Sequence, residues 1–280
     1  MFHNKHRLEC RLTYVYIESM AFKHITSRDN PVFKQLKKLA ETARERHREA
    51  LTLLDGVHLI EAYHQVFGEP HMLVIPEGKS SLEATQLLQH LQDVSTIMFP
   101  TLMFAELTPV ASSTGILALV KIPQIPPPEE ADFALMLEDI QDPGNMGSML
   151  RTAAAAGVQV VYLSKGCTDA WSPKALRGGQ GAQFVLPIVE QADLLPTLSN
   201  FNGNSYAMTM QGQSLYTQNF LSPSLFVIGN EGAGLSSSVV NAVDHSITIP
   251  MANTSTLAVE SLNAAAATAI CLFECQRQRS

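Results

Sequence analysis

The second half of the chain alternates short apolar segments with helical patterns, and this alternation constrains the fold more than any other feature. The apolar segments are "FALMLEDI", "VQVVYLS", "QFVLPIV", "SYAMTM", "SLFVIG" and "SITIP". Helical patterns lie between or after them from about 147, near 191–199, near 236–243 and from about 261. Short strands separated by helices predict a parallel sheet with helices on both faces.

A proline-rich segment separates this region from a smaller one. Residues 121–131, "KIPQIPPPEEA", hold four prolines, which cannot continue a helix or a central strand. We predict a linker there, a small α/β domain over 20–120 and a larger domain over 132–280. The small domain has helical patterns at 31–48 and 80–92 and apolar segments near 51–54, 72–75 and 115–120. Residues 1–19 lack periodicity, and we expect an extension outside the fold.

Composition narrows the class of protein. The chain is 46% hydrophobic and 16% charged, which is typical of a globular protein with a substantial core. No apolar run approaches the roughly 18 residues of a membrane span, and the first residues lack a signal-peptide pattern. Four scattered cysteines do not form a disulfide framework, and Cys271 and Cys275 fit buried thiols better than metal ligands. We therefore expect a cytoplasmic protein with no metal site.

The charge is distributed unevenly along the chain. The net charge is −7, yet residues 1–60 hold eleven Lys and Arg against seven Asp and Glu. The densest basic segment is "KQLKKLAETARERHRE", at 34–49. Such asymmetry points to a nucleic-acid-binding arm. The alternative is a solvated helix face, because Glu41, Glu45 and Glu49 alternate with the cations.

The segment "LEDIQDPGNMGSMLR", at 137–151, follows a predicted strand that ends at Asp139. We predict a turn at Pro143–Asn145 and a helix from about Gly147, with Arg151 one turn inside it. This places Asn145 and Arg151 at the carboxyl end of a parallel strand, where open α/β sheets bind ligands. A structural turn and a surface arginine are the alternatives.

Two further segments carry more glycine and polar residues than packing requires. The loop "GNEGAG", at 229–234, follows an apolar strand, but its spacing differs from the dinucleotide-binding G-x-G-x-x-G. A nucleotide-dependent oxidoreductase is therefore disfavoured. In the other segment, "ITIP" ends a strand at Pro250 and "SLN", at 261–263, opens a helix with Ser261 as a candidate N-cap.

Together, D-P-x-N-x-G-x-x-x-R, G-N-E-G-x-G, and I-P-M followed by S-L-N and an Ala-rich helix resemble the motifs of the SpoU (TrmH) family of RNA ribose 2′-O-methyltransferases. The segment "ITSRDNPVFKQLKKLAETARERHREALTLLDGVHLIEA" is similar to the small RNA substrate-binding domain of many members. The resemblance implies a trefoil knot at the C-terminal end of the sheet domain and S-adenosylmethionine as cofactor. It also implies a homodimer packed around the knot.

The resemblance also implies roles for individual residues. The catalytic set is Arg151, Asn145, Glu231, Ser261 and Asn263. The cofactor-binding set is Thr209, Gly229, Asn230, Gly232, Gly234, Ile249, Met251 and Leu262. The RNA-binding set is Lys34, Lys37, Lys38, Arg44, Arg46, Arg48, Lys174 and Arg177, with exposed structural charges as the alternative for Lys174 and Arg177.

The implied reaction is methyl transfer from S-adenosylmethionine to a ribose 2′-hydroxyl of rRNA. A tRNA substrate and a non-catalytic RNA-binding paralogue are the alternatives. Arg151 is either the base or an orienting group, and a guanidinium is not normally deprotonated in proteins. The loop at 252–260 is longer than the family's usual spacing, so its role stays open, as does the target nucleotide.

Overall fold

The computed structural model describes residues 22–78, 80–108, 115–252 and 261–280. These form two compact units: one holds the described residues up to Pro123 together with Trp171–Arg177, and the other holds the rest. The predicted extension at 1–19 and residues 253–260 of the long loop lie outside the described residues. No helix within the described ranges is long and apolar enough to cross a membrane.

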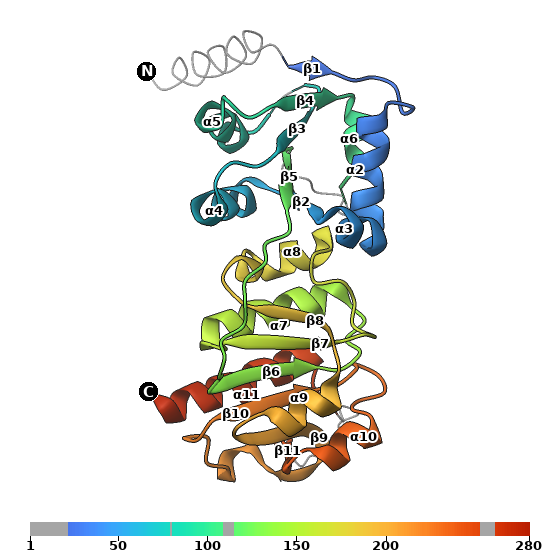
Figure 1. Cartoon of the computed structure of the whole chain (residues 1–280). Helices are drawn as coiled ribbons and strands as arrows, with labels where there is room; N and C mark the ends of the chain where they lie inside the picture. The colour runs from blue at the N-terminus through green and yellow to red at the C-terminus, as the bar shows by residue number, and fades with distance from the viewer. Residues whose placement is uncertain (1–21, 79, 109–114, 253–260) are drawn as a thin grey trace. The chain divides into compact units, whose positions relative to one another are not determined.

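The first unit is built on a mixed five-stranded sheet in the order β1-β4-β3-β5-β2. Strand β3 is parallel to β4, which is parallel to β1, whereas β5 runs antiparallel to both β3 and β2. Figure 1 shows α2 and α6 on one face of this sheet and α4 and α5 on the other. The strands are β1 (Lys23–His24), β2 (Leu51–Asp55), β3 (Met72–Pro76), β4 (Thr96–Phe99) and β5 (Leu117–Lys121). The helices are α2 (Pro31–Glu41), α3 (Ala43–Glu49), α4 (Val57–Phe67), α5 (Leu82–His90), α6 (Thr101–Ala105) and α8 (Pro173–Gly179), of which α8 extends to Gly179 in the second unit.

The second unit confirms the predicted parallel sheet. Its six strands lie in the order β11-β9-β10-β6-β7-β8, and every neighbouring pair is parallel. The strands are β6 (Phe133–Leu137), β7 (Val160–Ser164), β8 (Ile188–Ala192), β9 (Asn204–Ser214), β10 (Ser224–Ile228) and β11 (His245–Thr248). The helices are α7 (Pro143–Ala156), α9 (Leu194–Asn200), α10 (Ser237–Ala242) and α11 (Ala264–Arg279), with short 3₁₀ turns at η1 (Ala182–Phe184) and η2 (Leu215–Thr217).

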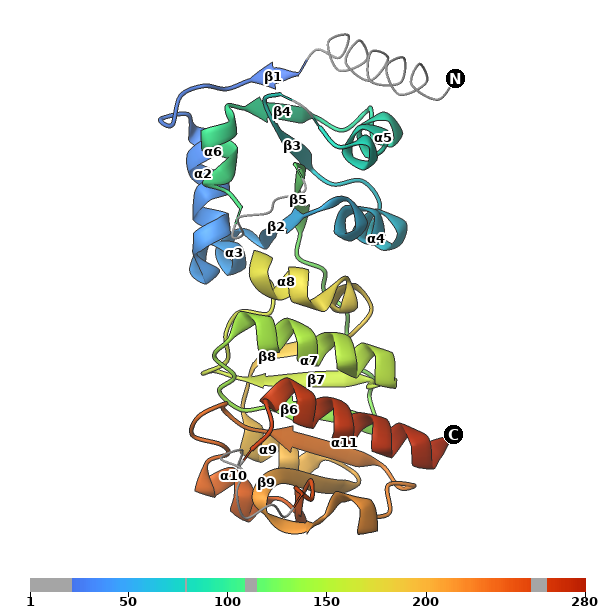
Figure 2. The same cartoon turned by 180° about the vertical axis from the view of Figure 1, so that it is seen from behind.

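Helices cover both faces of the six-stranded sheet, as Figures 1 and 2 show for α9 and α10 on one side and α7 and α11 on the other. Leu194 and Leu198 of α9 and Val239 of α10 pack against Met136 and Val227 of the central strands. All residues of β6 and β10 are buried, as is typical of parallel strands covered twice.

Strand β9 leaves the sheet in its middle. His245 and Ser246 of β11 pair with Tyr206 and Ala207, whereas the next residue of β11, Ile247, pairs with Gln213. Residues 208–212 therefore have no partner on β11. Gly212 ends this excursion, and a Cβ there would lie 2.5 Å from the carbonyl oxygen of Ser246, so the backbones can meet so closely only at glycine.

Burial confirms the interpretation of the two cysteines on α11. Cys271 and Cys275 are free and buried against the sheet side of the helix. Burial raises the pKa of both thiols, that of Cys275 to about 11, because the charged thiolate is poorly solvated there.

Two predicted elements are wrong in detail. The helical pattern at 31–48 is two helices separated by Thr42, whose backbone is extended. The apolar run "QFVLPIV" begins as the 3₁₀ turn η1 instead of a strand, and β8 starts only at Ile188. Pro187 lacks the N–H that a strand residue would offer its neighbour, which delays the start of β8.

The break at Thr42 explains why Arg46, a predicted RNA-binding residue, is buried. In a continuous helix the carbonyl groups of Leu39 and Ala40 would bond to residues four positions on. Here the guanidinium of Arg46 donates to both carbonyl oxygens, and the residue is only 3% exposed. Arg46 therefore caps the end of α2, and its burial argues against the predicted contact with RNA.

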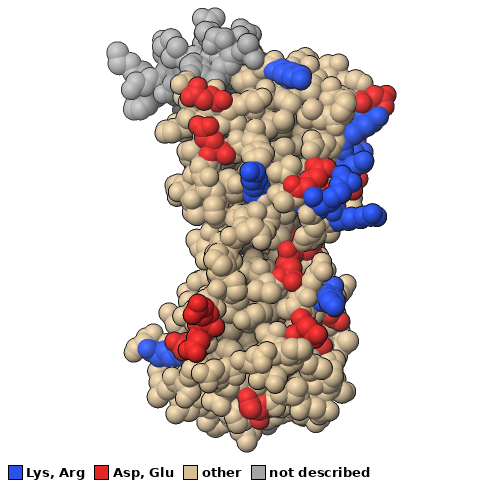
Figure 3. Space-filling model, in the orientation of Figure 1, with Lys and Arg blue, Asp and Glu red and all other residues tan. Residues whose placement is uncertain are grey.

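The other basic residues of this segment lie at the surface of α2 and α3, where Figure 3 shows Lys and Arg side chains gathered. Lys34 pairs with Asp29 and Lys37 with Glu106, at 2.8 and 2.9 Å. Arg48 pairs with the neighbouring glutamates of α3. Lys38 and Arg44 are exposed, and neither side chain forms a hydrogen bond or an ion pair with another described residue.

We predict that Arg46→Ala lowers the free energy of unfolding by about 2 kcal/mol, because two carbonyl groups lose a charged donor in a buried setting. Urea denaturation followed by circular dichroism measures this. Arg44→Ala is the matched control, and its exposed side chain should change the value by less than about 0.5 kcal/mol. Equal effects of the two substitutions would contradict the capping role.

Candidate functional site

The candidate site lies at the carboxyl edge of the six-stranded sheet, the edge where open α/β folds bind ligands. A cavity of about 820 Å³ opens there among the middle of β9 and the segments that follow β10 and β11. Ala264 and Ala267 of α11 form part of its wall. Small-molecule sites commonly measure about 300–1,000 Å³, so this cavity has the size of a cofactor site.

The residues that line the cavity include those that the resemblance to the SpoU family assigned to cofactor binding. Every residue of the predicted cofactor-binding set lines it, namely Thr209, Gly229, Asn230, Gly232, Gly234, Ile249, Met251 and Leu262. Glu231 and Ser261 of the predicted catalytic set line it as well, whereas Asn145, Arg151 and Asn263 do not.

The glycine loop is folded tightly upon itself. Asn230 and Gly234 exchange two backbone hydrogen bonds, of 3.1 and 2.9 Å. A Cβ on Gly229 would collide with the backbone of Gly234 and lie 2.5 Å from the nitrogen of Leu235. Gly234 has a φ of +70°, which few other residues adopt. A Cβ on Gly232 would instead meet only the Asn230 side chain, at 3.6 Å.

The side chain of Asn230 holds this loop in shape. Its Oδ1 accepts hydrogen bonds from the backbone N–H groups of Gly232 and Ala233, at 2.9 and 2.8 Å. Its Nδ2 donates to the carbonyl oxygen of Asp139, at 2.8 Å, just after β6. The polar atoms of this side chain are thus engaged by the protein itself, so Asn230 borders the cavity mainly through its backbone.

Three residues from the three sequence motifs form one hydrogen-bonded chain. The Nδ2 of Asn263 donates to Oδ1 of Asn145 at 3.1 Å. The Nδ2 of Asn145 donates in turn to Oε1 of Glu231 at 3.0 Å. The start of α11, the first turn of α7 and the glycine loop are therefore joined side chain to side chain.

Glu231 accepts further hydrogen bonds from the backbone N–H groups of Gln141 and Asp142, at 3.1 and 3.2 Å. Partial burial by itself raises the pKa of the Glu231 carboxyl, but the bonds from Asn145 and from the backbone outweigh it and hold the pKa below its usual value. The carboxylate is thus charged at neutral pH and acts as an acceptor that fixes the turn before α7.

The structure corrects the predicted start of α7. Pro143, Gly144 and Asn145 are its first helical turn instead of a separate turn, and Arg151 lies six residues beyond Asn145 on the same helix. Asp142 is the N-cap, and its Oδ1 accepts from the backbone N–H of Asn145 at 2.8 Å. An N-cap Asp followed by Pro at the first helical position is a helix-start signature that could have been recognised in the sequence.

Arg151 is exposed and stands apart from the hydrogen-bonded chain. Six residues along a helix correspond to about 9 Å and to a different face from that of Asn145. Its guanidinium makes no hydrogen bond or ion pair with any other residue that the structure describes. An exposed guanidinium without a protein partner keeps all its donors available to an anion.

The start of α11 also differs from its prediction. Asn263, and not Ser261, is the N-cap, because its Oδ1 accepts from the backbone N–H groups of Ala265 and Ala266, at 2.9 and 3.3 Å. Asn263 therefore both starts the helix and bonds to Asn145. Ser261 precedes the helix, is exposed and lines the cavity.

Lys174 and Arg177 lie on α8, in the segment that belongs to the first unit. Arg177 forms an ion pair of 3.6 Å with Asp55, whose side chain is 1% exposed. This contact favours the structural interpretation of Arg177. Lys174 is exposed on the same helix.

One polar residue at the site was missed by sequence reasoning. Glu138, directly after β6, accepts from the backbone N–H of Ser236 at 2.7 Å and from its hydroxyl at 2.6 Å. Ser236 is the N-cap of α10, so Glu138 fixes the far end of the glycine loop. The pattern S-S-S-V-V marks this cap in the sequence, but nothing local indicates its partner.

Comparison with known proteins matches this site to one family. The family model described as the SpoU rRNA Methylase family matches residues 132–273. An uncharacterised tRNA/rRNA methyltransferase of Synechocystis is 34% identical, with 91% of this chain and 94% of that protein covered. A 23S rRNA guanosine 2′-O-methyltransferase of Bacillus subtilis is 29% identical, with 90% and 98% covered. The crystal structure of the SpoU methyltransferase AviRb from Streptomyces viridochromogenes, in complex with the cofactor AdoMet, has a TM-score of 0.77 at 27% identity, with 89% and 98% of the two chains covered.

Gly229→Ala and Gly232→Ala form a matched pair of substitutions within one loop. We predict that Gly229→Ala lowers the stability of the ligand-free protein by about 1–3 kcal/mol, because its Cβ collides with loop backbone. Gly232→Ala should change it by less than about 0.5 kcal/mol, since its Cβ has room. Differential scanning fluorimetry without ligand compares the two, and similar melting temperatures would show that the loop is not as tightly closed as described.

Proposed function

The chain belongs to the SpoU rRNA methylase family, and we propose that it transfers a methyl group from S-adenosylmethionine to a ribose 2′-hydroxyl of rRNA. The observation that carries this proposal is the chain of hydrogen bonds from Asn263 through Asn145 to Glu231, which joins the three motifs beside one cavity. Relatives that match along nearly their whole length are named for 2′-O-methylation of 23S rRNA, which supports the rRNA substrate.

The cavity fits S-adenosylmethionine in size and in the chemistry of its walls. Its lining combines the glycine loop, whose backbone is accessible where side chains are absent, with the apolar side chains of Met208, Met210, Ile249 and Leu262. When bound, S-adenosylmethionine supplies a methyl group on a positively charged sulfonium. The protein must then exclude water from the methyl group and bring a ribose oxygen into line with it.

Arg151 is proposed to orient the ribose 2′-oxygen and an adjacent phosphate. Guanidinium groups are not normally deprotonated in proteins, so Arg151 is proposed to act through hydrogen bonds and charge and not as the base. Its exposed position and its lack of a partner among the described residues support this role. Glu231 fixes the start of the helix that carries it, since it accepts from the Asn145 side chain in the first turn of α7 and from the backbone N–H of the N-cap Asp142.

Ser261 and Asn263 are proposed to complete the site from the α11 side. Asn263 holds the start of α11 against Asn145, and the exposed Ser261 hydroxyl lies at the cavity wall. We further propose that the C-terminal part of the sheet domain forms a trefoil knot and that α11, where Phe273 is 44% exposed, packs against a second copy of the chain. The resemblance of the motifs supports both ideas.

The first unit is proposed to bind RNA through the exposed cations of α2 and α3. Lys38 and Arg44 are the strongest candidates because no carboxylate neutralises them through an ion pair among the described residues. Lys34, Lys37 and Arg48 must share their charge with carboxylates. Contacts of this kind position a phosphate backbone and do not read its sequence.

Mapping of ribose methylation tests the function directly. In cells that lack the gene, we expect a 2′-O-methyl mark to be missing from rRNA, and we expect the wild-type gene but not Arg151→Ala to restore it. Purified Arg151→Ala should bind S-adenosylmethionine normally and transfer the methyl group at least about 100-fold more slowly. Arg151→Lys separates orientation from base catalysis, because an acting base at this position would work better as lysine at high pH.

The outcomes of this experiment are distinct. Loss of a mark from tRNA alone would move the substrate to tRNA, and loss of no mark would leave the enzyme proposal without support. Near-normal turnover by Arg151→Ala would overturn the role of Arg151 alone.

The RNA-binding surface has its own test. The double variant Lys38→Ala and Arg44→Ala should bind an rRNA fragment more weakly, and the slope of log affinity against log salt should fall by about 1–2. Filter binding at several salt concentrations measures both quantities. Lys121→Ala, which removes a cation carried by β5 in the same unit, is the control and should leave the slope unchanged. An unchanged slope in the double variant would exclude these two residues.

A further inference from the structure

Helix α11 is held at both ends by contacts of different kinds. At its start, Asn263 bonds to Asn145, and Ala264 and Ala267 form part of the cavity wall. Its other end reaches the opposite, amino edge of the sheet, where Gln278 and Arg279 meet the segments that lead into β6 and β10. The helix of 16 residues is about 24 Å long, so the two ends lie far apart.

Arg279 is bonded to two separate chain segments. Its guanidinium nitrogens donate to the carbonyl oxygens of Phe220 and Ser222 at 2.7 and 2.6 Å, and to the hydroxyl of Ser224 at 3.1 Å. Another nitrogen donates to the carbonyl oxygen of Asp132 at 3.1 Å. The guanidinium also lies over the ring of Phe133, 5.1 Å from its centroid. These contacts attach the helix to the entry points of the two fully buried central strands.

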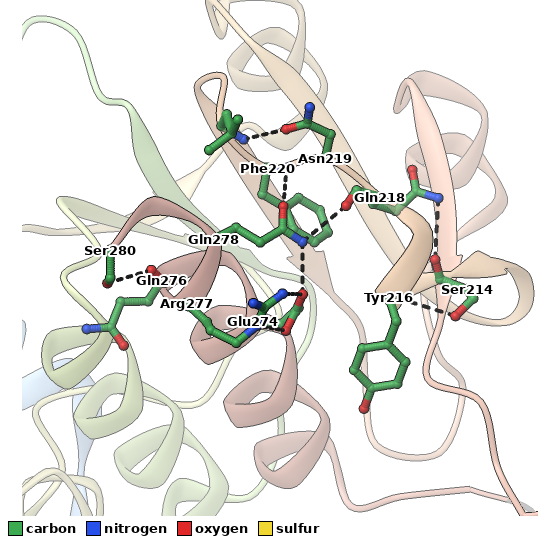
Figure 4. Close-up of polar contacts among 11 residues, drawn as sticks. Ser214, Tyr216, Gln218, Asn219, Phe220, Glu274, Gln276, Arg277, Gln278 and Ser280 are labelled. Carbon is green, nitrogen blue, oxygen red and sulfur yellow. Dashed lines mark hydrogen bonds and ion pairs between the residues drawn. The ribbon is translucent and has the colours of Figure 1, made fainter.

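Gln278 adds a second attachment to the same region, as Figure 4 shows. Its Oε1 accepts from the backbone N–H of Phe220 at 3.0 Å, and its Nε2 donates to the carbonyl oxygen of Gln218 at 3.1 Å. Glu274, one turn earlier, accepts from the same Nε2 at 2.8 Å and holds the amide in place. We define the α11 anchor as the contacts that Gln278 and Arg279 make with residues 218–224 and 132–133.

The α11 anchor adds to the packing of the buried Cys271, Leu272 and Cys275 by fixing the position of the helix along its axis. The first turns of α11 present alanines, whose small side chains interlock weakly with a neighbour and resist sliding along the axis poorly. Hydrogen bonds to carbonyl oxygens are directional and fail when the helix shifts by an ångström or more. Because a helix is stiff along its axis, a shift at Arg279 becomes a shift of the cavity wall at Ala264 and Ala267.

We propose that Arg279, supported by Gln278, is a positioning residue for the cofactor: the α11 anchor sets the axial position of the helix and so the shape of the cavity at the other edge of the sheet. This inference rests on the proposed use of S-adenosylmethionine in that cavity. It predicts that an alteration remote from the cavity weakens cofactor binding without impairing the reaction once the cofactor is bound.

Calorimetric titration of full-length protein with S-adenosylmethionine tests this in Arg279→Ala. The dissociation constant should rise about tenfold, the effect of losing several hydrogen bonds of one charged group. The turnover at saturating cofactor and the KM for RNA should stay within about twofold of wild type. In the ligand-free protein, the amides of the first half of α11 should exchange hydrogen faster than in wild type.

Gln276→Ala is the matched control. Gln276 lies on the same turn, is exposed, and its side chain takes no part in the α11 anchor. Its removal should leave the dissociation constant unchanged. A purely structural role of Arg279 would lower the melting temperature while the dissociation constant stayed at the wild-type value, and that result would overturn the proposal.

Two further variants keep the test decisive. Arg279→Lys retains the charge but loses the fork of donors, and we expect a smaller rise in the dissociation constant. If Arg279→Ala does not fold, Gln278→Ala is used, and a dissociation constant equal to that of wild type would overturn the proposal. Wild-type protein that neither binds S-adenosylmethionine nor methylates RNA would instead refute the proposed function, and this inference with it.

Discussion

The hydrogen bonds from Asn263 through Asn145 to Glu231 are the interaction on which the site depends. Each of the three residues begins or fixes a local structure of its own: Asn263 caps α11, Asn145 lies in the first turn of α7, and Glu231 accepts from the turn before α7. A change in one of them would therefore disturb both a local backbone and the residue or residues bonded to it in this chain. These two bonds join residues that are 118 and 86 positions apart in the sequence, so distant segments of the second unit are held together by amide and carboxylate groups.

The architecture of the second unit could be predicted largely from its sequence. Buried strands such as Phe133–Leu137 and Ser224–Ile228 are continuous apolar runs bounded by polar residues, and their length and spacing determine a parallel sheet. Residues that line the cavity could be predicted because the motifs resemble those of a known family. Hydrophobic periodicity locates helices and strands but does not locate a ligand site. Short elements were harder: β4 has four residues and α6 has five, which is too few for a period to be visible.

What could not be predicted depended on partners distant in the sequence or on the exact end of a helix. Arg46 has the same local pattern as its exposed neighbours, and only the break at Thr42 creates the two carbonyl groups that bury it. Asn263 displaced Ser261 as a cap because its amide also had a partner on α7. Arg177 was predicted as a candidate phosphate contact because its ion-pair partner, Asp55, lies far earlier in the chain and could not be foreseen.

In strand β9, the residues that pair with β11 are different from the residues that line the cavity. Residues 206–207 and 213–214 carry the pairing with β11, while 208–212 between them are not paired with a β11 residue and supply Met208, Thr209 and Met210 to the cavity. Substitutions or even a change of length in this short stretch can thus alter the ligand-facing wall while the ladder on either side stays in register. Gly212 sets the limit of that freedom, since the returning backbone must pass against Ser246. Binding preference in this part of the cavity is therefore open to evolutionary variation at little cost to folding.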